Sequence, residues 1–112
     1  MTGLIEGPAL KLTPMDVSTF LRQQQEAATS ELRNIGSGSD LTARALRSPF
    51  EARAAILAWL TENRVTDEES LVRTLDAVIG EREVVPSVAP RVGANEAGYL
   101  LRRWRWFNPP TA

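Results

Sequence analysis

The sequence of 112 residues contains no histidine and no cysteine, and Lys11 is its only lysine. Histidine is the commonest general base of enzymes, and cysteine is a frequent nucleophile and zinc ligand, so the usual catalytic inventory is missing. Without cysteine the chain forms no disulfide bond, and nothing indicates an oxidising compartment. We therefore expect a protein that is not an enzyme, with no catalytic residues, no cofactor and no metal ion.

Long apolar runs are also lacking. The longest uncharged stretch near the centre, residues 54–61, is much shorter than the roughly 20 residues that span a bilayer. The first residues have neither the basic start nor the apolar run of a signal peptide. We therefore predict a cytoplasmic protein, or one incorporated into a particle assembled in the cytoplasm, that has no membrane partner.

The composition is that of an ordinary folded domain, with 43% hydrophobic and 24% charged residues. A chain of this length is too short for two separate cores, so residues 1–112 are expected to form one domain. The net charge of −1 argues against nucleic-acid binding over the whole surface. The charge is nevertheless uneven: residues 66–83 contain six acidic and two basic residues, whereas residues 84–112 contain four arginines and one glutamate.

Capping motifs predict where the helices of the core, residues 13–80, begin and end. Thr13, Ser48 and Thr66 each have an acidic residue three positions later, which is typical of a helix N-cap. A proline directly after Thr13 and after Ser48 suits the first helical position. Gly36 and Gly80 follow apolar stripes at helical spacing, and we expect them to end their helices.

Between the first helix and Ser48 the sequence predicts a flexible loop, residues 36–39, and a separate short helix, residues 40–47. The apolar residues of this short helix are expected to be buried, and they are Leu41, Ala45 and Leu46. The next helix contains Arg53 as the only polar residue of the segment 52–60, which places that segment in the middle of a bundle.

The two ends of the chain differ from this core. Residues 1–12 are predicted to form an extended arm broken by glycine and proline. Residues 81–94 are predicted to form an extended connector, because two prolines exclude a regular helix there. Asn95 is the expected cap of a last element, residues 95–107, which the sequence leaves open between helix and strand, followed by a tail, residues 108–112. The fold class is therefore all-α: a compact bundle of four to five helices with an extended N-terminal arm and an extended Pro/Val connector before the last helix.

The last element combines three arginines with four aromatic residues, which is the composition of interaction hot spots. On a helix, Trp104 and Phe107 share the face that docks on the bundle, whereas Tyr99 and Trp106 lie on the opposite face. On a strand, Trp104 and Trp106 share one side. Either geometry leaves aromatic surface uncovered, so we predict a partner-binding surface. Its residues are Tyr99, Arg102, Arg103, Trp104, Arg105, Trp106 and Phe107.

A complementary acidic surface is predicted from Asp67, Glu68, Glu69 and Asp76. These acids would repel phosphate, so the helix pair around residues 63–66 is better interpreted as an ordinary helical hairpin than as a DNA-binding helix-turn-helix. The acidic and basic segments could pair within one chain or between copies of the chain.

The leading hypothesis is a non-catalytic structural or adaptor protein that binds another protein or copies of itself. It would be a small subunit of a larger assembly, for example a virus-particle or phage-connector component. The alternative is a small regulatory protein that binds nucleic acid through the C-terminal Arg/Trp segment. A third interpretation is that the aromatic rings only close the bundle, with the arginine head groups reaching into solvent.

Overall fold

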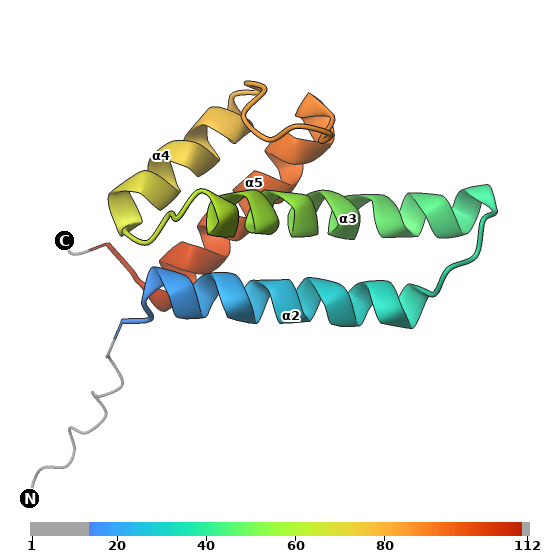
Figure 1. Cartoon of the computed structure of the whole chain (residues 1–112), viewed down its shortest axis with the longest axis horizontal. Helices are drawn as coiled ribbons and strands as arrows, with labels where there is room; N and C mark the ends of the chain where they lie inside the picture. Colours follow the sequence, from blue (N-terminus) through green and yellow to red (C-terminus); the bar gives the residue numbers. More distant parts are fainter. Residues whose placement is uncertain (1–13, 111–112) are drawn as a thin grey trace, which may run out of the picture.

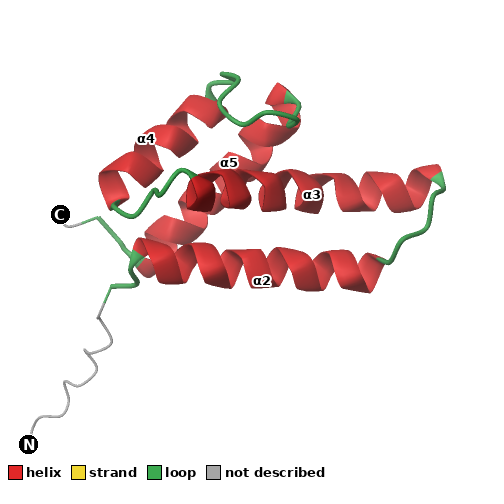
Figure 2. Ribbon diagram, viewed as in Figure 1, coloured by secondary structure: helices red, strands yellow, loops and turns green. Residues whose placement is uncertain are grey.

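The computed structural model describes residues 14–110, and the regular secondary structure in that range is entirely helical (Figure 2). These residues form four helices: α2 (Val17–Ile35), α3 (Leu41–Glu62), α4 (Glu68–Ile79) and α5 (Pro90–Phe107). The all-α prediction is therefore confirmed for this part of the chain, with the helix number at the lower end of the expected four to five. The predicted arm, residues 1–12, and the predicted cap Thr13 lie outside the described residues.

Helices α2 and α3 run antiparallel as a long hairpin, and α4 and α5 pack together at one end of it (Figure 1). Helix α5 crosses the C-terminal half of α3, while the end of α2 and the start of α3 extend beyond it. The Cα radius of gyration is 16.3 Å, whereas a compact domain of this length has a value of about 13 Å. The α2–α3 hairpin that projects beyond α5 contributes to this larger value (Figure 1).

One hydrophobic core joins all four helices, because each helix places apolar residues at spacings of three and four on its inner face. Three valines of the segment between α4 and α5, Val84, Val85 and Val88, pack against this core. The largest fully buried side chains are Phe20, Ile56, Leu57, Leu60, Leu71, Leu75 and Leu100.

Two helices begin later than the capping motifs predict, because an aspartate caps each of them. The Asp16 carboxylate accepts a 2.7 Å hydrogen bond from the backbone N–H of Thr19, so this residue is the cap and not the third residue of α2. The Asp67 carboxylate accepts a 2.9 Å bond from the N–H of Ser70, so the predicted cap Thr66 lies one residue before the actual one. Aspartate is the better cap because its negative charge also interacts favourably with the positive end of the helix dipole.

The two helices predicted for residues 40–47 and 48–62 are one continuous helix, α3, so the prediction of a helix start at Ser48 is wrong. The Asp40 carboxylate caps α3 by accepting a bond of 2.8 Å from the N–H of Ala43. Pro49 lies inside the helix, where it removes one backbone hydrogen bond but keeps a helical φ. Packing of the rest of α3 against α2 and α5 offsets this local loss.

The predicted burial of three residues at the start of α3 is also wrong. Leu41 is 81% exposed and Leu46 is 56% exposed, and Ala45 is exposed as well. The physical reason is that this part of α3 extends beyond α5, so no helix of the described chain covers its outer side (Figure 1).

Of the two glycines that the sequence predicts as helix ends, Gly36 and Gly80, one has the left-handed conformation. Gly36 ends α2 in a left-handed conformation, with φ of +85°, as expected. After α4, Gly80 has φ of −78°, and the left-handed residue is Glu81, with φ of +62°. The N–H groups of Glu81 and the next residue donate to carbonyls of the last turn of α4, which closes the helix as a Schellman motif. Arg64, with φ of +57°, occupies the corresponding position after α3.

Helix α5 begins earlier than predicted, at Pro90. The connector therefore ends at Ala89, and it is not extended throughout as predicted, because residues 86–87 form a turn in which Ser87 has φ of +72°. Asn95 is an exposed residue within the helix and not its cap. Proline is favoured at the first helical position, because the N–H that it lacks would have no partner there. The segment that the sequence left open between helix and strand is helical through Phe107.

Candidate interaction surface

Trp104 anchors α5 in the core. Its ring meets the ring of Phe20 edge-on, with centroids 5.2 Å apart, and its Nε1 donates a hydrogen bond of 2.8 Å to Glu68 at the start of α4. Phe107 also contacts Phe20, with ring centroids 6.4 Å apart. These contacts use the inner face that the sequence periodicity predicts for α5. The buried apolar side chains of that face are Ala97, Leu100, Leu101 and Trp104.

The predicted partner-binding residues fall into two groups. Trp104 is buried, and Tyr99, Arg103 and Phe107 are half-buried. The guanidinium carbon of Arg103 lies 5.2 Å from the centroid of the Phe107 ring, so these two side chains cover each other. These four residues therefore direct much of their surface to the bundle itself.

The second group is exposed and consists of Arg102, Arg105 and Trp106, which we call the C-terminal patch. Trp106 is 72% exposed. The three residues share one side of α5, because residues three and four apart are neighbours on a helix. Tryptophan and arginine are the residue types most enriched among interface hot spots. The C-terminal patch is thus the part of the predicted surface that is free to contact a partner.

The predicted acidic residues all lie on α4 or at its start, and two of them accept hydrogen bonds from other residues of the chain. Asp67 caps the helix, and Glu68 accepts the hydrogen bond of Trp104. The bond between Glu68 and Trp104 ties the start of α4 to α5, although the two residues are 36 positions apart in the chain. Glu68 therefore helps to orient the helix that carries the C-terminal patch.

The outer side of α4 carries an open hollow of about 850 Å³ that is lined by Val72, Ala77 and charged side chains. Among these, Glu69 and Arg73 form an exposed ion pair at 3.8 Å, and Asp76 is exposed. Exposed pairs of this kind contribute little to stability. None of the ion pairs within residues 14–110 joins the acids of α4 to the arginines of α5.

A buried ion pair between α3 and α5 is the main polar feature that the sequence did not predict. Arg53 Nη2 lies 2.7 Å from Oε1 of Glu96, and the two side chains are only 12% and 11% exposed. Arg53 Nε also donates to Oε1, at 2.9 Å. The guanidinium carbon lies 3.8 Å from the centroid of the Tyr99 ring and 4.9 Å from that of Phe50. Arg53 is the only polar residue of the segment 52–60. A buried charge in such an apolar segment needs a partner of opposite charge, so the sequence did contain a signal for this ion pair.

Two carboxyl groups, Asp16 and Asp67, have a pKa clearly below the usual value. The cause is in each case the hydrogen bonding that caps a helix, from Thr19 to Asp16 and from Ser70 to Asp67.

Within residues 14–110, no group of three or more acidic, histidine or cysteine side chains could hold a metal ion. In the same part of the chain, no helix combines the length and the apolar character needed to cross a membrane.

Comparison with known proteins gives no match: no family model fits the sequence, and no curated protein or solved structure is significantly similar to it. The function is therefore inferred from the residues of this chain and from the surfaces that they form.

Proposed function

We propose that this protein is a non-catalytic structural or adaptor protein that acts by protein–protein interaction, as a small subunit of a larger assembly. The observation that supports this most strongly is the C-terminal patch, in which Trp106 is 72% exposed on a helix that Trp104 holds in the core. A virus particle or phage connector remains the example of such an assembly that the sequence suggested.

Covering Trp106 would be energetically favourable. A large aromatic side chain presents about 200 Å² of surface, so burying the exposed 72% of it would contribute about 3–4 kcal/mol at about 25 cal/mol per Å². Because α5 is already anchored, binding would order few additional side chains, and little conformational entropy would be lost.

The partner that best fits the C-terminal patch is an acidic protein surface with an apolar floor. The hollow on α4 of another copy is net acidic, because three acidic and two arginine side chains line it beside Val72. Such a contact would join two different surfaces of the subunit and would produce a ring or a filament.

Light scattering of the purified protein at low and high salt tests this proposal. We expect a mass above that of the monomer at low salt and a lower mass at high salt, because salt screens exposed charges. The test variant combines Trp106→Ala with Arg102→Glu and Arg105→Glu. Arg103 is left unchanged because its side chain covers Phe107.

The matched control is Arg22→Glu combined with Arg33→Glu, which makes the same change of charge at two exposed positions of α2. We expect the control to assemble like the wild type, and the test variant to lose the salt-dependent increase in mass with unchanged helicity. A salt-dependent increase in mass that survives in the test variant would contradict the role of the C-terminal patch.

The alternative of nucleic-acid binding is less well supported. Stacking of successive bases needs several free aromatic rings, but Trp104 is buried and Trp106 is the one tryptophan of the segment that is exposed. The two exposed arginines would contact about two phosphates, which gives weak binding at physiological salt.

A further inference from the structure

A second exposed apolar surface lies at the free end of the α2–α3 hairpin. Leu41, Thr42, Ala45, Leu46 and Pro49 fall within an arc of about 140° on α3, at 100° per residue, and we call them the tip stripe. The two leucines are 81% and 56% exposed. The charged residues of this part of α3 lie outside the arc, so the tip stripe is free of charge.

The tip stripe continues the face by which α3 packs into the core. Ala52, Ile56 and Leu60 follow Ala45 and Pro49 at spacings of three and four residues, and all three are buried where α3 meets its neighbours. The sequence thus extends a helix-packing face beyond the point at which α5 ends its cover (Figure 1). This continuity makes the tip stripe a surface on which another helix can pack.

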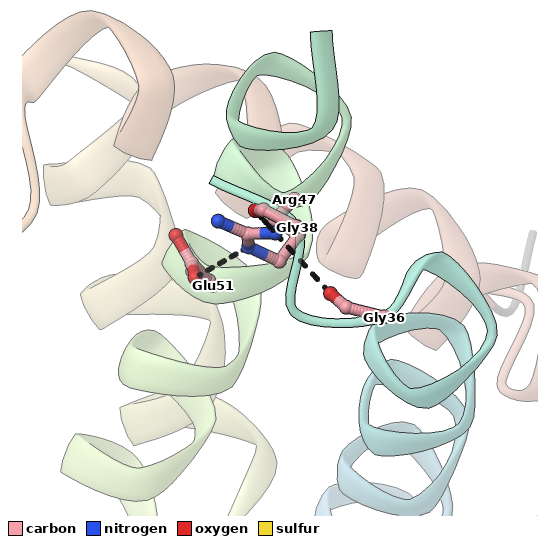
Figure 3. A network of polar contacts seen from close by, with 4 residues as sticks. All are labelled: Gly36, Gly38, Arg47 and Glu51. Carbon is pink, nitrogen blue, oxygen red and sulfur yellow. Dashed lines mark hydrogen bonds and ion pairs between the residues drawn. The ribbon is translucent and has the colours of Figure 1, made fainter. Parts of the chain in front are cut away.

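The hairpin tip is held in a defined conformation (Figure 3). Arg47 Nη1 donates hydrogen bonds to the carbonyl oxygens of Gly36 at 3.2 Å and Gly38 at 2.5 Å, and its Nε lies 3.6 Å from Oε2 of Glu51. Arg47 is therefore turned towards the loop and away from the tip stripe. A surface that is already ordered loses little conformational entropy when it binds.

We propose that the tip stripe is the contact of a two-fold homodimer, in which the hairpin tips of two copies pack side by side with antiparallel α3 helices. A two-fold contact pairs a surface with its own image, so the surface must be self-complementary. The tip stripe fulfils this condition, because it has no charge to repel its image and it carries leucines at both edges. Thr42 and Ala45, between the leucines, allow the two helices to approach closely.

This contact is separate from the C-terminal patch and does not depend on the proposed function. The two contacts also differ in their response to salt. The patch relies on charge and should weaken in high salt, whereas the charge-free tip stripe should not. The dimer is therefore measured in high salt, in the variant that carries Trp106→Ala, Arg102→Glu and Arg105→Glu.

The first test is light scattering of that variant over a series of protein concentrations. We expect a twofold rise in mass with concentration, and loss of this rise after Leu41→Ser with Leu46→Ser. Ile79→Ser, at an exposed apolar residue of α4, is the control and should leave the rise unchanged. A monomer at every concentration would overturn the proposal, and so would a dimer that the two serine substitutions do not affect.

The second test uses the absence of cysteine from the chain. With Ala45→Cys as the only cysteine, a disulfide can form only between two copies, and a two-fold axis at the tip brings these residues together. We expect oxidation to give a disulfide-linked dimer, and Glu62→Cys, an exposed position at the other end of α3, to give none. Equal cross-linking of both variants would overturn the proposal, because it would reflect random collision.

Discussion

Replacing Glu96 by alanine should destabilise the protein more than any single surface substitution. The change would leave the Arg53 guanidinium, which is only 12% exposed, without its carboxylate partner. Removing one member of a buried ion pair costs about 3–5 kcal/mol, because the remaining charge is neither solvated nor paired. A small domain has a free energy of unfolding of about 5–15 kcal/mol, so this loss would be a large fraction of the total.

A double-mutant cycle separates the ion pair from the packing around it. Arg53→Met removes the charge but keeps a long apolar side chain that can still contact Tyr99 and Phe50. When Glu96→Ala is made in the Arg53→Met background, we expect it to cost about 1–2 kcal/mol, since no unpaired charge remains. The difference between the two backgrounds is the coupling energy of the pair.

Urea unfolding followed by circular dichroism measures these free energies. The expected result is a large decrease of the unfolding midpoint for Glu96→Ala and a partial recovery in the double variant, with a similar dependence on urea. A loss below about 1 kcal/mol for Glu96→Ala, or the same loss in both backgrounds, would refute the claim that this pair is desolvated and coupled.

Two further predictions concern backbone positions. Gly93→Ala should lower the free energy of unfolding by about 1–2 kcal/mol, because the new methyl carbon would lie 2.9 Å from Cγ1 of Val88. Gly98→Ala, in the same helix but with its nearest neighbouring atom at 3.4 Å, should instead raise the free energy of unfolding by about 0.5–1 kcal/mol through helix propensity; equal effects at the two glycines would contradict the close approach at Gly93. Glu81→Gly should raise the free energy of unfolding by about 0.5–1 kcal/mol, because Glu81 has a left-handed conformation that glycine adopts without strain. Urea midpoints measure all three variants, and a destabilised Glu81→Gly protein would argue against that backbone conformation.

The sequence predicted the helical class and the inner faces of the helices because both follow from local periodicity. The docking face of α5, including Trp104, was predicted correctly for this reason. For α2 and α4 the capping motifs located the helix starts to within a few residues, but they chose Thr66 where the structure has Asp67, since several residues in a row can act as a cap.

The errors arose where tertiary packing decides the structure. Pro49 was interpreted as a helix start, but the packing of α3 on its neighbours keeps the helix continuous through it. The exposure of Leu41 and the pairing of Arg53 with Glu96 depend on where α5 crosses α3, which local sequence does not determine. The helical periodicity placed Trp104 on the docking face and Trp106 on the outer face, as the structure has them. It was wrong for Tyr99, which it also placed on the outer face but which is half-buried against the core and Arg53, because that depends on the rotation of α5 against the bundle.

The central claim is that the protein acts by assembly through its C-terminal patch. The most direct test is the native mass of the wild-type chain and of the Trp106→Ala, Arg102→Glu, Arg105→Glu variant at low salt, where the Debye length is about 30 Å. We expect a larger mass for the wild type than for the variant, and a decrease of the wild-type mass when added salt shortens the Debye length to about 3 Å. Equal masses for the two proteins at low salt would contradict it.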